Sequence, residues 1–216
     1  EVYNFITDLE TKNVLKDRNQ IAFLFKSVKN SKVIGLAEYL EEKGIQIFSP
    51  RSSLFFEREE VKLIIGAIVF VFRDLFEILK WSDNAELEVW DYYKSCQLVF
   101  ANKLRDNKTE HEPLIKWCNK RAKEHLHLTE GTNYGFAAMV YQLLEFSMFS
   151  KYLSIGLDAN KKDLRPSYNI ALLTKLLWKF EYLNNVTVIT PESKERILSN
   201  LFNKFFRFII DGGIEE

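Results

Sequence analysis

The sequence predicts a mainly α-helical protein with a small α/β part at its N-terminus. Two short apolar runs, IAFLF at residues 21–25 and IQIF at residues 45–48, have the length and composition of buried strands, and an amphipathic stretch separates them. From residue 57 onward, apolar residues recur at helical spacing almost without interruption. We therefore expect two domains, residues 1–56 and residues 57–216.

The first domain is expected to contain a strand–helix–strand unit. Residues 1–13 show the spacing of an amphipathic helix, and residues 31–43 return to that spacing after the first apolar run. Gly44 stands where a helix commonly ends. Strand, helix and strand over this length form a right-handed βαβ unit with parallel strands. Two such strands alone leave both edges unpaired, so we expect the missing strands in other parts of a larger protein.

The second domain is expected to hold about six helices, because the apolar spacing is interrupted only at short polar segments. These helices are predicted at residues 57–80, 84–106, 110–127, 134–153, 167–183 and 191–210. Aromatic residues are abundant, with 18 Phe alone, and such large side chains usually fill helix–helix contacts. In the last two helices this core prediction covers Trp178, Phe180, Tyr182, Phe202, Phe205, Phe206 and Phe208.

Charge, hydropathy and cysteine content narrow the class of protein. Lys plus Arg and Asp plus Glu number 30 each, so any DNA contact must come from a local basic patch. The longest uncharged apolar run, residues 63–72, is about half of what a bilayer requires. No signal peptide opens the chain, so we expect a cytoplasmic protein that does not enter a membrane. In that compartment Cys96 and Cys118 are expected to be free, buried thiols rather than a disulfide.

Sequence motifs of catalysis are missing. The chain holds no phosphate-binding loop, nucleophile elbow, HExxH or CxxC motif. His125 and His127 are two residues apart, so a helix would point them to different faces, and we expect surface or packing histidines rather than a metal site. By itself the chain is predicted to bind no cofactor and to turn over no substrate.

One part of the sequence resembles a known family. The segment IAFLFKSVKNSK, a helix, GIQIF and then SPRSSLFFEREEVK is similar to one region of superfamily 1 DNA helicases of the Rep, UvrD and PcrA type. In that family an aromatic-aromatic-acid-Arg-x-Glu-Val/Ile-Lys block opens a large helical insertion, named 2B, within the second motor domain, named 2A. The matching residues, in order and spacing, are Phe55, Phe56, Glu57, Arg58, Glu60, Val61 and Lys62. Beyond residue 63 the resemblance is architectural: a helical insertion of similar size.

The resemblance implies a segment of an ATP-dependent DNA helicase. Residues 1–56 would be the edge of the RecA-like domain 2A, and residues 57–216 the 2B insertion. ATP and magnesium would bind to other parts of the parent protein, which would move along single-stranded DNA and unwind duplex in DNA repair or recombination. The segment alone would be inactive, and 2B would regulate unwinding by swinging relative to the motor and meeting duplex DNA or partner proteins.

Three residues are implied contacts to single-stranded DNA. In such helicases the C-terminal end of this strand lines the DNA groove, where short donors hold phosphates without reading bases. Lys26 matches the family's basic position and Ser27 its hydroxyl position. Val28 falls where the family often has Asn, and Asn30 is the candidate replacement. Ordinary solvation of this loop is the alternative.

The junction between the two domains is assigned to Phe55, Phe56, Arg58 and Glu60. We expect the two phenylalanines to pack and fix the hinge rather than stack on bases. Arg58 is expected to form a local ion pair with Glu60 or Glu57, which would be weak if exposed.

Two basic clusters in the helical domain are candidate contacts to duplex DNA or to a partner protein, with a solvated surface as the alternative. The first is Lys116, Lys120, Arg121 and Lys123, and the second is Lys161, Lys162 and Arg165. Two other functions stay open. The chain could be a stand-alone helical protein-interaction module without a motor, or part of a nuclease-linked recombination subunit of helicase ancestry.

Overall fold

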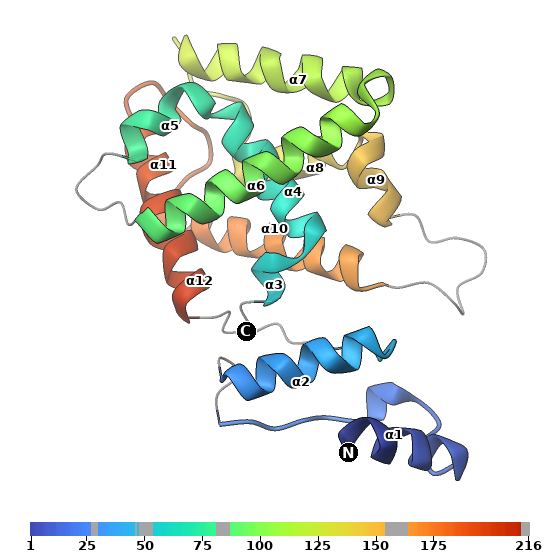
Figure 1. The fold of residues 1–216 in the computed structure, drawn as a ribbon. Helices are drawn as coiled ribbons and strands as arrows, with labels where there is room; N and C mark the ends of the chain where they lie inside the picture. The colour runs from blue at the N-terminus through green and yellow to red at the C-terminus, as the bar shows by residue number, and fades with distance from the viewer. Residues whose placement is uncertain (27–29, 46, 48–53, 81–86, 154–163, 213–216) are drawn as a thin grey trace.

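The structure is a computed structural model of residues 1–216 that describes all of them except 27–29, 46, 48–53, 81–86, 154–163 and 213–216. The described residues are mostly helical and none of them is in a β-strand, which confirms the mainly α fold class (Figure 1). Helices α1 (Val2–Thr11) and α2 (Ser31–Glu42) lie below a larger bundle that all the later helices form (Figure 1).

The N-terminal helices pack on each other through a small hydrophobic cluster. Ile6 of α1 and Leu40 of α2 are buried there together with Ile45. The rings of Tyr3 and Tyr39 meet edge-on with their centroids 6.5 Å apart. This cluster is separate from the main core and contains only three buried hydrophobic residues among those described. A core this small contributes little to the stability of the N-terminal region.

The first predicted strand does not form in the structure. Residues 21–25 run as an irregular segment between the short 3₁₀ helix η1 (Arg18–Gln20) and α2 (Figure 1). A strand is defined by hydrogen bonds to a neighbouring strand, and the described residues offer none. In the second predicted strand, Ile45 and Ile47 are not in a strand, and residues 46 and 48 lie outside the described residues. The βαβ unit is therefore not shown.

The larger bundle contains all the helices predicted after residue 57, some of them divided. Its elements are α3 (Leu54–Glu57), α4 (Glu59–Val71), α5 (Arg73–Lys80), α6 (Leu87–Asp106), α7 (Lys108–Leu126), α8 (Phe136–Leu143), α9 (Ser147–Leu153), α10 (Arg165–Asn184), α11 (Lys194–Ser199), the π-helix η3 (Asn200–Phe206) and α12 (Arg207–Gly212). The predicted helix 57–80 is divided at Phe72, and the predicted helix 134–153 is divided between α8 and α9.

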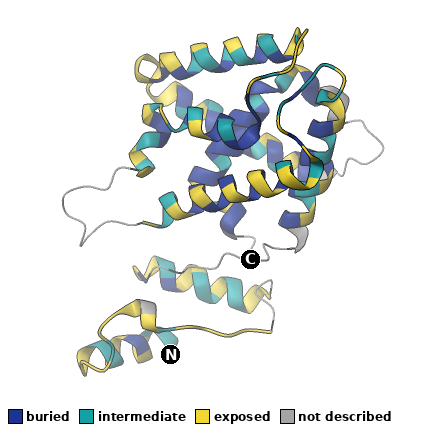
Figure 2. Ribbon diagram, turned by 180° about the vertical axis from the view of Figure 1, so that it is seen from behind, coloured by how far each residue is buried: buried dark blue, intermediate teal, exposed yellow. Residues whose placement is uncertain are grey.

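Helix α4 lies at the centre of this bundle. Nearly all of its residues from Val61 to Val71 are buried, which explains why its sequence is apolar on every side. Helices α6, α7 and α10 surround it, and the buried residues gather in the interior of the bundle (Figure 2). Gly66 marks the closest approach to α6, because a Cβ there would collide with the Cys96 backbone and with Phe100. The bundle therefore has one tightly packed core around α4.

Candidate functional site

The structure describes two of the three residues predicted to contact DNA. Lys26 is exposed at the end of the irregular segment. Asn30 is the N-cap of α2, where its Oδ1 accepts a hydrogen bond from the Lys32 N–H at 2.9 Å. Ser27 lies outside the described residues. The cap uses the Asn30 oxygen, whereas a contact to a phosphate would use the Asn30 Nδ2 group as the donor.

Phe55 and Phe56 are both buried at 3% exposure and belong to the main core. Their rings meet edge-on at 5.0 Å, and Phe56 also meets the Tyr92 ring edge-on at 6.2 Å. The Tyr92 hydroxyl donates to the Phe56 carbonyl at 2.7 Å, which fixes the backbone at the start of the bundle. Enclosed rings of this kind pack, and no face of them is open to a nucleic-acid base.

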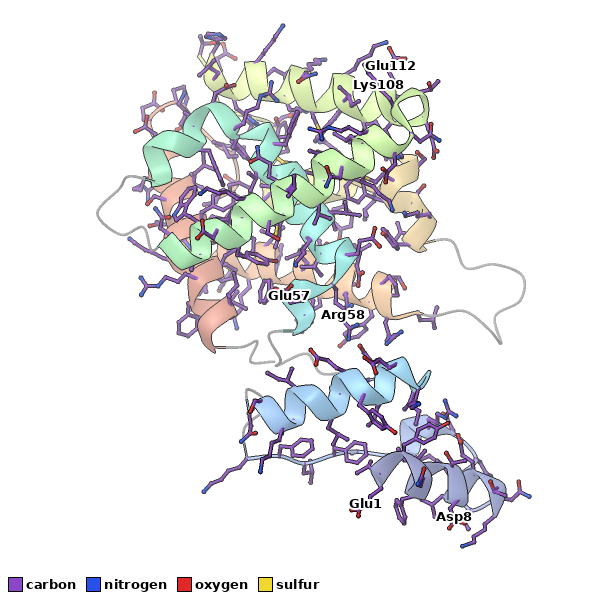
Figure 3. The ribbon with its side chains drawn as sticks, viewed as in Figure 1. Glu1, Asp8, Glu57, Arg58, Lys108 and Glu112 are labelled. Carbon is purple, nitrogen blue, oxygen red and sulfur yellow. The ribbon has the colours of Figure 1, made fainter. Side chains whose placement is uncertain are left out.

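The sequence predicts that Arg58 pairs with Glu60 or Glu57, and this prediction is wrong. It pairs with Glu41 of α2, with Nη2 2.6 Å from Oε1 and Nη1 3.2 Å from Oε2. This is a bidentate arrangement, the strongest geometry for an Arg–carboxylate pair. Glu57 pairs instead with Lys62. Arg58 and Glu57 lie at the edge of the bundle that faces α2 (Figure 3).

A second arginine joins the same carboxylate. Arg165, the first residue of α10, places Nη1 3.3 Å from Oε1 of Glu41. We call Glu41, Arg58 and Arg165 the Glu41 clamp. The three side chains are 25%, 28% and 28% exposed, so solvent weakens the pairs without removing them. The sequence predicts Arg165 in a surface basic cluster, whereas in the structure it connects α10 to α2.

Glu60 lies just inside the clamp and is only 6% exposed. Its Oε1 accepts a hydrogen bond from Nδ2 of Asn169, on α10, at 2.6 Å. A buried carboxylate needs such a partner, because an unpaired one is very costly in free energy. The nearby Tyr152 hydroxyl is also enclosed, and burial, together with the charges of Glu59 and Glu60, raises the pKa of Tyr152. Glu60 thus holds α4 to α10 beneath the clamp.

The clamp yields a prediction about the junction. Glu41→Lys is expected to release α2 from the bundle, because it sets a third positive charge between two arginines. The free energy of unfolding of the bundle should change by about 1 kcal/mol or less, since the pairs are partly exposed. Hydrogen exchange of the α2 backbone amides should become faster while exchange in α4 stays unchanged.

Glu42→Lys is the matched control, because the neighbouring Glu42 is exposed and the charge change is identical. It should leave exchange in α2 close to that of the unaltered chain. Equal acceleration by both variants would contradict the role of the clamp.

Two lysines of the basic cluster on α7 lie beside acidic residues. Lys116 lies 2.8 Å from Glu112, and Lys120 lies 3.9 Å from Glu124, each pair one helical turn apart on the surface. Both lysines are 75% exposed. Glu124 is shared, because Arg121 lies 2.8 Å from it, so these acids offset only part of the positive field that a contact to duplex DNA would need. In the second cluster, Lys161 and Lys162 lie outside the described residues.

Arg121 turns inward and belongs to a buried polar group. Its guanidinium lies over the Tyr134 ring at 4.6 Å, and the Tyr134 hydroxyl is 2.9 Å from Nε2 of His125. The His125 ring stacks on Phe72 at a centroid distance of 4.3 Å. Burial, with help from the Arg121 charge, lowers the pKa of His125 to about 4. His125 is therefore a neutral packing residue.

The two cysteines are free and buried, as predicted. Burial raises the pKa of the Cys96 and Cys118 thiols to about 12 each, so neither is a reactive thiolate near neutral pH. Within the described ranges, His, Cys, Asp and Glu side chains do not gather in groups of three that could hold a metal ion.

Three aromatic residues that the sequence predicts to be buried are exposed. Trp178 is 61% exposed, Tyr182 is 72% exposed and Phe208 is 73% exposed, although all were predicted to be buried. The Trp178 and Tyr182 rings stack on the outer face of α10 with centroids 5.9 Å apart. Residues four apart lie on the same side of a helix, so Trp178 and Tyr182 share the outer side of α10, whereas Phe180 faces the core. The abundance of aromatic residues in a helix does not show which of them face the core.

Taken together, the described side chains form one polar junction, the Glu41 clamp, and one exposed aromatic face on α10. In the parts of the chain that the structure describes, no helix is both long and apolar enough to cross a bilayer. Neither a protein-family model, nor a curated protein, nor a solved structure matches this chain.

Proposed function

We propose that this chain is a regulatory segment of a UvrD-like ATP-dependent DNA helicase. Residues 1–56 would be the edge of motor domain 2A, and residues 57–216 the 2B insertion. The observation that carries the proposal is the exposed apolar segment before α2, where Leu24 is 94% exposed and Phe23 and Phe25 are 41% and 43% exposed. Apolar runs of this length ordinarily lie inside a parallel sheet with both faces covered.

The proposal supplies the neighbours that this segment needs. In the parent motor, residues 21–25 and 45–48 would become parallel strands of a βαβ unit around α2, paired with strands from other parts of the protein. Lys26 would then sit at the C-terminal end of a strand, where open α/β sheets bind ligands, and contact a DNA phosphate beside Ser27 and Asn30. ATP and Mg would bind elsewhere in the parent protein, which would act in the cytoplasm.

The Glu41 clamp supports a regulatory role for the helical domain. A 2B domain that swings must break its contacts to the motor at low cost in free energy. Partly exposed ion pairs suit that requirement, because each contributes only about 1 kcal/mol or less. A large apolar interface at the same place would lock the two domains together.

The proposal is tested on the protein made from the whole open reading frame that encodes these residues. Binding to fluorescent oligo(dT) is measured by anisotropy at several salt concentrations. Lys26→Ala should weaken binding and reduce the slope of log K against log salt by about 1, as expected for the loss of one phosphate contact. Lys43→Ala, at the far end of α2, is the matched control and should bind normally. Unchanged binding by Lys26→Ala would count against the proposed groove.

The second candidate, a stand-alone protein-interaction module, is favoured by the exposed aromatic face of α10. The sequence of the whole open reading frame distinguishes the helicase from the interaction module. A helicase requires a GKT or GKS phosphate loop upstream and a T-x-H-x-x-K-G-x-E-type motif downstream. A nuclease domain after the motor would indicate the recombination subunit instead.

A further inference from the structure

An apolar groove lies between α10 and the pair α8 and α9. Its volume is about 630 Å³, within the range of pockets that bind small molecules. Its apolar lining includes Ala137, Tyr141, Leu144, Leu153, Ile170 and Trp178. Tyr141 and Trp178 are 63% and 61% exposed, an unusual state for large aromatic side chains on neighbouring helices. Exposed aromatic side chains beside a hollow make this groove a candidate interaction site.

The α10 side of the groove has the length of a short helix. Oε1 of Glu181, near the end of α10, accepts the Ala137 N–H at the start of α8 at 2.9 Å, which places these two helix ends side by side. The α10 residues that line the groove run from Ser167 to Trp178. At 1.5 Å rise per residue this is about 16 Å, or about three turns of a partner helix lying alongside.

The two sides of the groove carry opposite charges. Lys175 lines it on the α10 side, and Lys179 follows one turn later on the same side of that helix. Both lysines are exposed, and neither forms an ion pair with another described residue. Glu145 lines the groove on the side of α8 and α9. An occupant with acidic residues along the α10 side and a basic or neutral residue near Glu145 would complement both.

We propose that this groove binds an amphipathic helix with an acidic flank, presented by a partner protein. Apolar side chains at positions i, i+4 and i+7 of that helix would enter the groove, and Trp178, at one end of its α10 side, would be the aromatic anchor. Aspartate or glutamate beside them would meet Lys175 and Lys179. The groove belongs wholly to the helical bundle, so the proposal holds whether or not the chain is part of a helicase.

A nucleic acid is the competing occupant. The parallel Trp178 and Tyr182 rings beside lysines have the chemistry of a platform on which bases stack. Two features favour the peptide helix. Glu145 would repel a phosphate backbone in the groove. The lining is also predominantly apolar, which stacked bases do not require and the buried face of an amphipathic helix does.

The test begins with a phage-displayed library of random helical peptides, selected on purified residues 1–216. Selected peptides should share apolar residues at i, i+4 and i+7 with flanking Asp or Glu. A synthetic, fluorescein-labelled copy of the most enriched peptide is then titrated by anisotropy. Trp178→Ala should weaken its binding at least tenfold, and Lys175→Glu combined with Lys179→Glu should do the same.

Two matched variants control this experiment. Lys108→Glu with Lys204→Glu makes the same charge change at two other exposed lysines of the bundle, and Phe208→Ala removes another exposed aromatic ring on α12. Both should bind the peptide as the unaltered chain does, and circular dichroism should show all variants folded. The proposal is overturned if selection enriches nothing beyond a Trp178→Ala control, if the peptides are basic, or if the groove variants bind normally. Loss of oligo(dT) binding in the groove variants, without peptide binding, would assign the face to nucleic acid.

Discussion

Gly66→Ala is expected to lower the free energy of unfolding by about 2 kcal/mol. The added Cβ would lie 2.8 Å from Cβ of Phe100 and still closer to the carbonyl oxygen of Cys96. A backbone oxygen cannot rotate away as a side chain can, so α4 and α6 must separate, at a cost of about 3 kcal/mol for an overpacked core. The better helix propensity of alanine offsets about 1 kcal/mol of this.

Gly35→Ala is the matched control for this prediction. It makes the same substitution inside helix α2, where an added Cβ would meet no atom within 4 Å. At Gly35 only the higher helix propensity of alanine matters, so the free energy of unfolding should stay equal or rise by up to about 1 kcal/mol. Urea unfolding followed by circular dichroism measures both variants. If Gly66→Ala were as stable as Gly35→Ala, α4 and α6 would not be in the close contact described.

Stability is expected to fall by about 2 kcal/mol between pH 7 and pH 5 because of His125 alone. Burial lowers the pKa of His125 in the folded protein to about 4, from an ordinary value of 6.5. The unfolded chain therefore takes up a proton first as the pH falls. The stabilisation from this residue is complete above pH 6.5, is lost progressively down to about pH 4, and changes no further below that.

His125→Leu isolates this effect from the titration of carboxylates. The variant loses the hydrogen bond to Tyr134 and is less stable at pH 7, but its stability should depend less on pH by about 2 kcal/mol between pH 7 and pH 5. His127→Gln removes an exposed histidine from the same helix end and should keep the pH dependence of the unaltered chain. Urea unfolding at pH 7 and pH 5 measures the free energy of unfolding of each variant. Equal pH dependence in His125→Leu and the unaltered chain would contradict a buried, neutral His125.

The helices of the bundle could be predicted because their apolar spacing is local. The run from Leu63 to Phe72 indicated a buried segment, and α4 is that segment. The break at Phe72 could not be predicted, because no proline or glycine marks it and packing against His125 holds the ring there. Aromatic content alone does not show which side of a helix faces the core, so the prediction that Trp178 and Tyr182 are buried is wrong.

The ion pairs of the Glu41 clamp could not be predicted from the spacing of residues along the sequence. Glu41 is 17 residues from Arg58 and 124 residues from Arg165, so no spacing rule connects them. The sequence favoured pairs within a few residues, since those are the only ones that helix geometry predicts. For the apolar run at residues 21–25, the predicted strand is not seen in the structure. Its composition indicates a strand, but strand formation depends on a partner, and the described residues supply none.

The most direct test of the helicase proposal is ATP hydrolysis by the protein made from the complete reading frame, measured with and without single-stranded DNA. We expect hydrolysis to rise strongly when DNA is added, and residues 1–216 alone to hydrolyse no ATP under either condition. A full-length protein without DNA-stimulated hydrolysis, or hydrolysis by residues 1–216 alone, would contradict it.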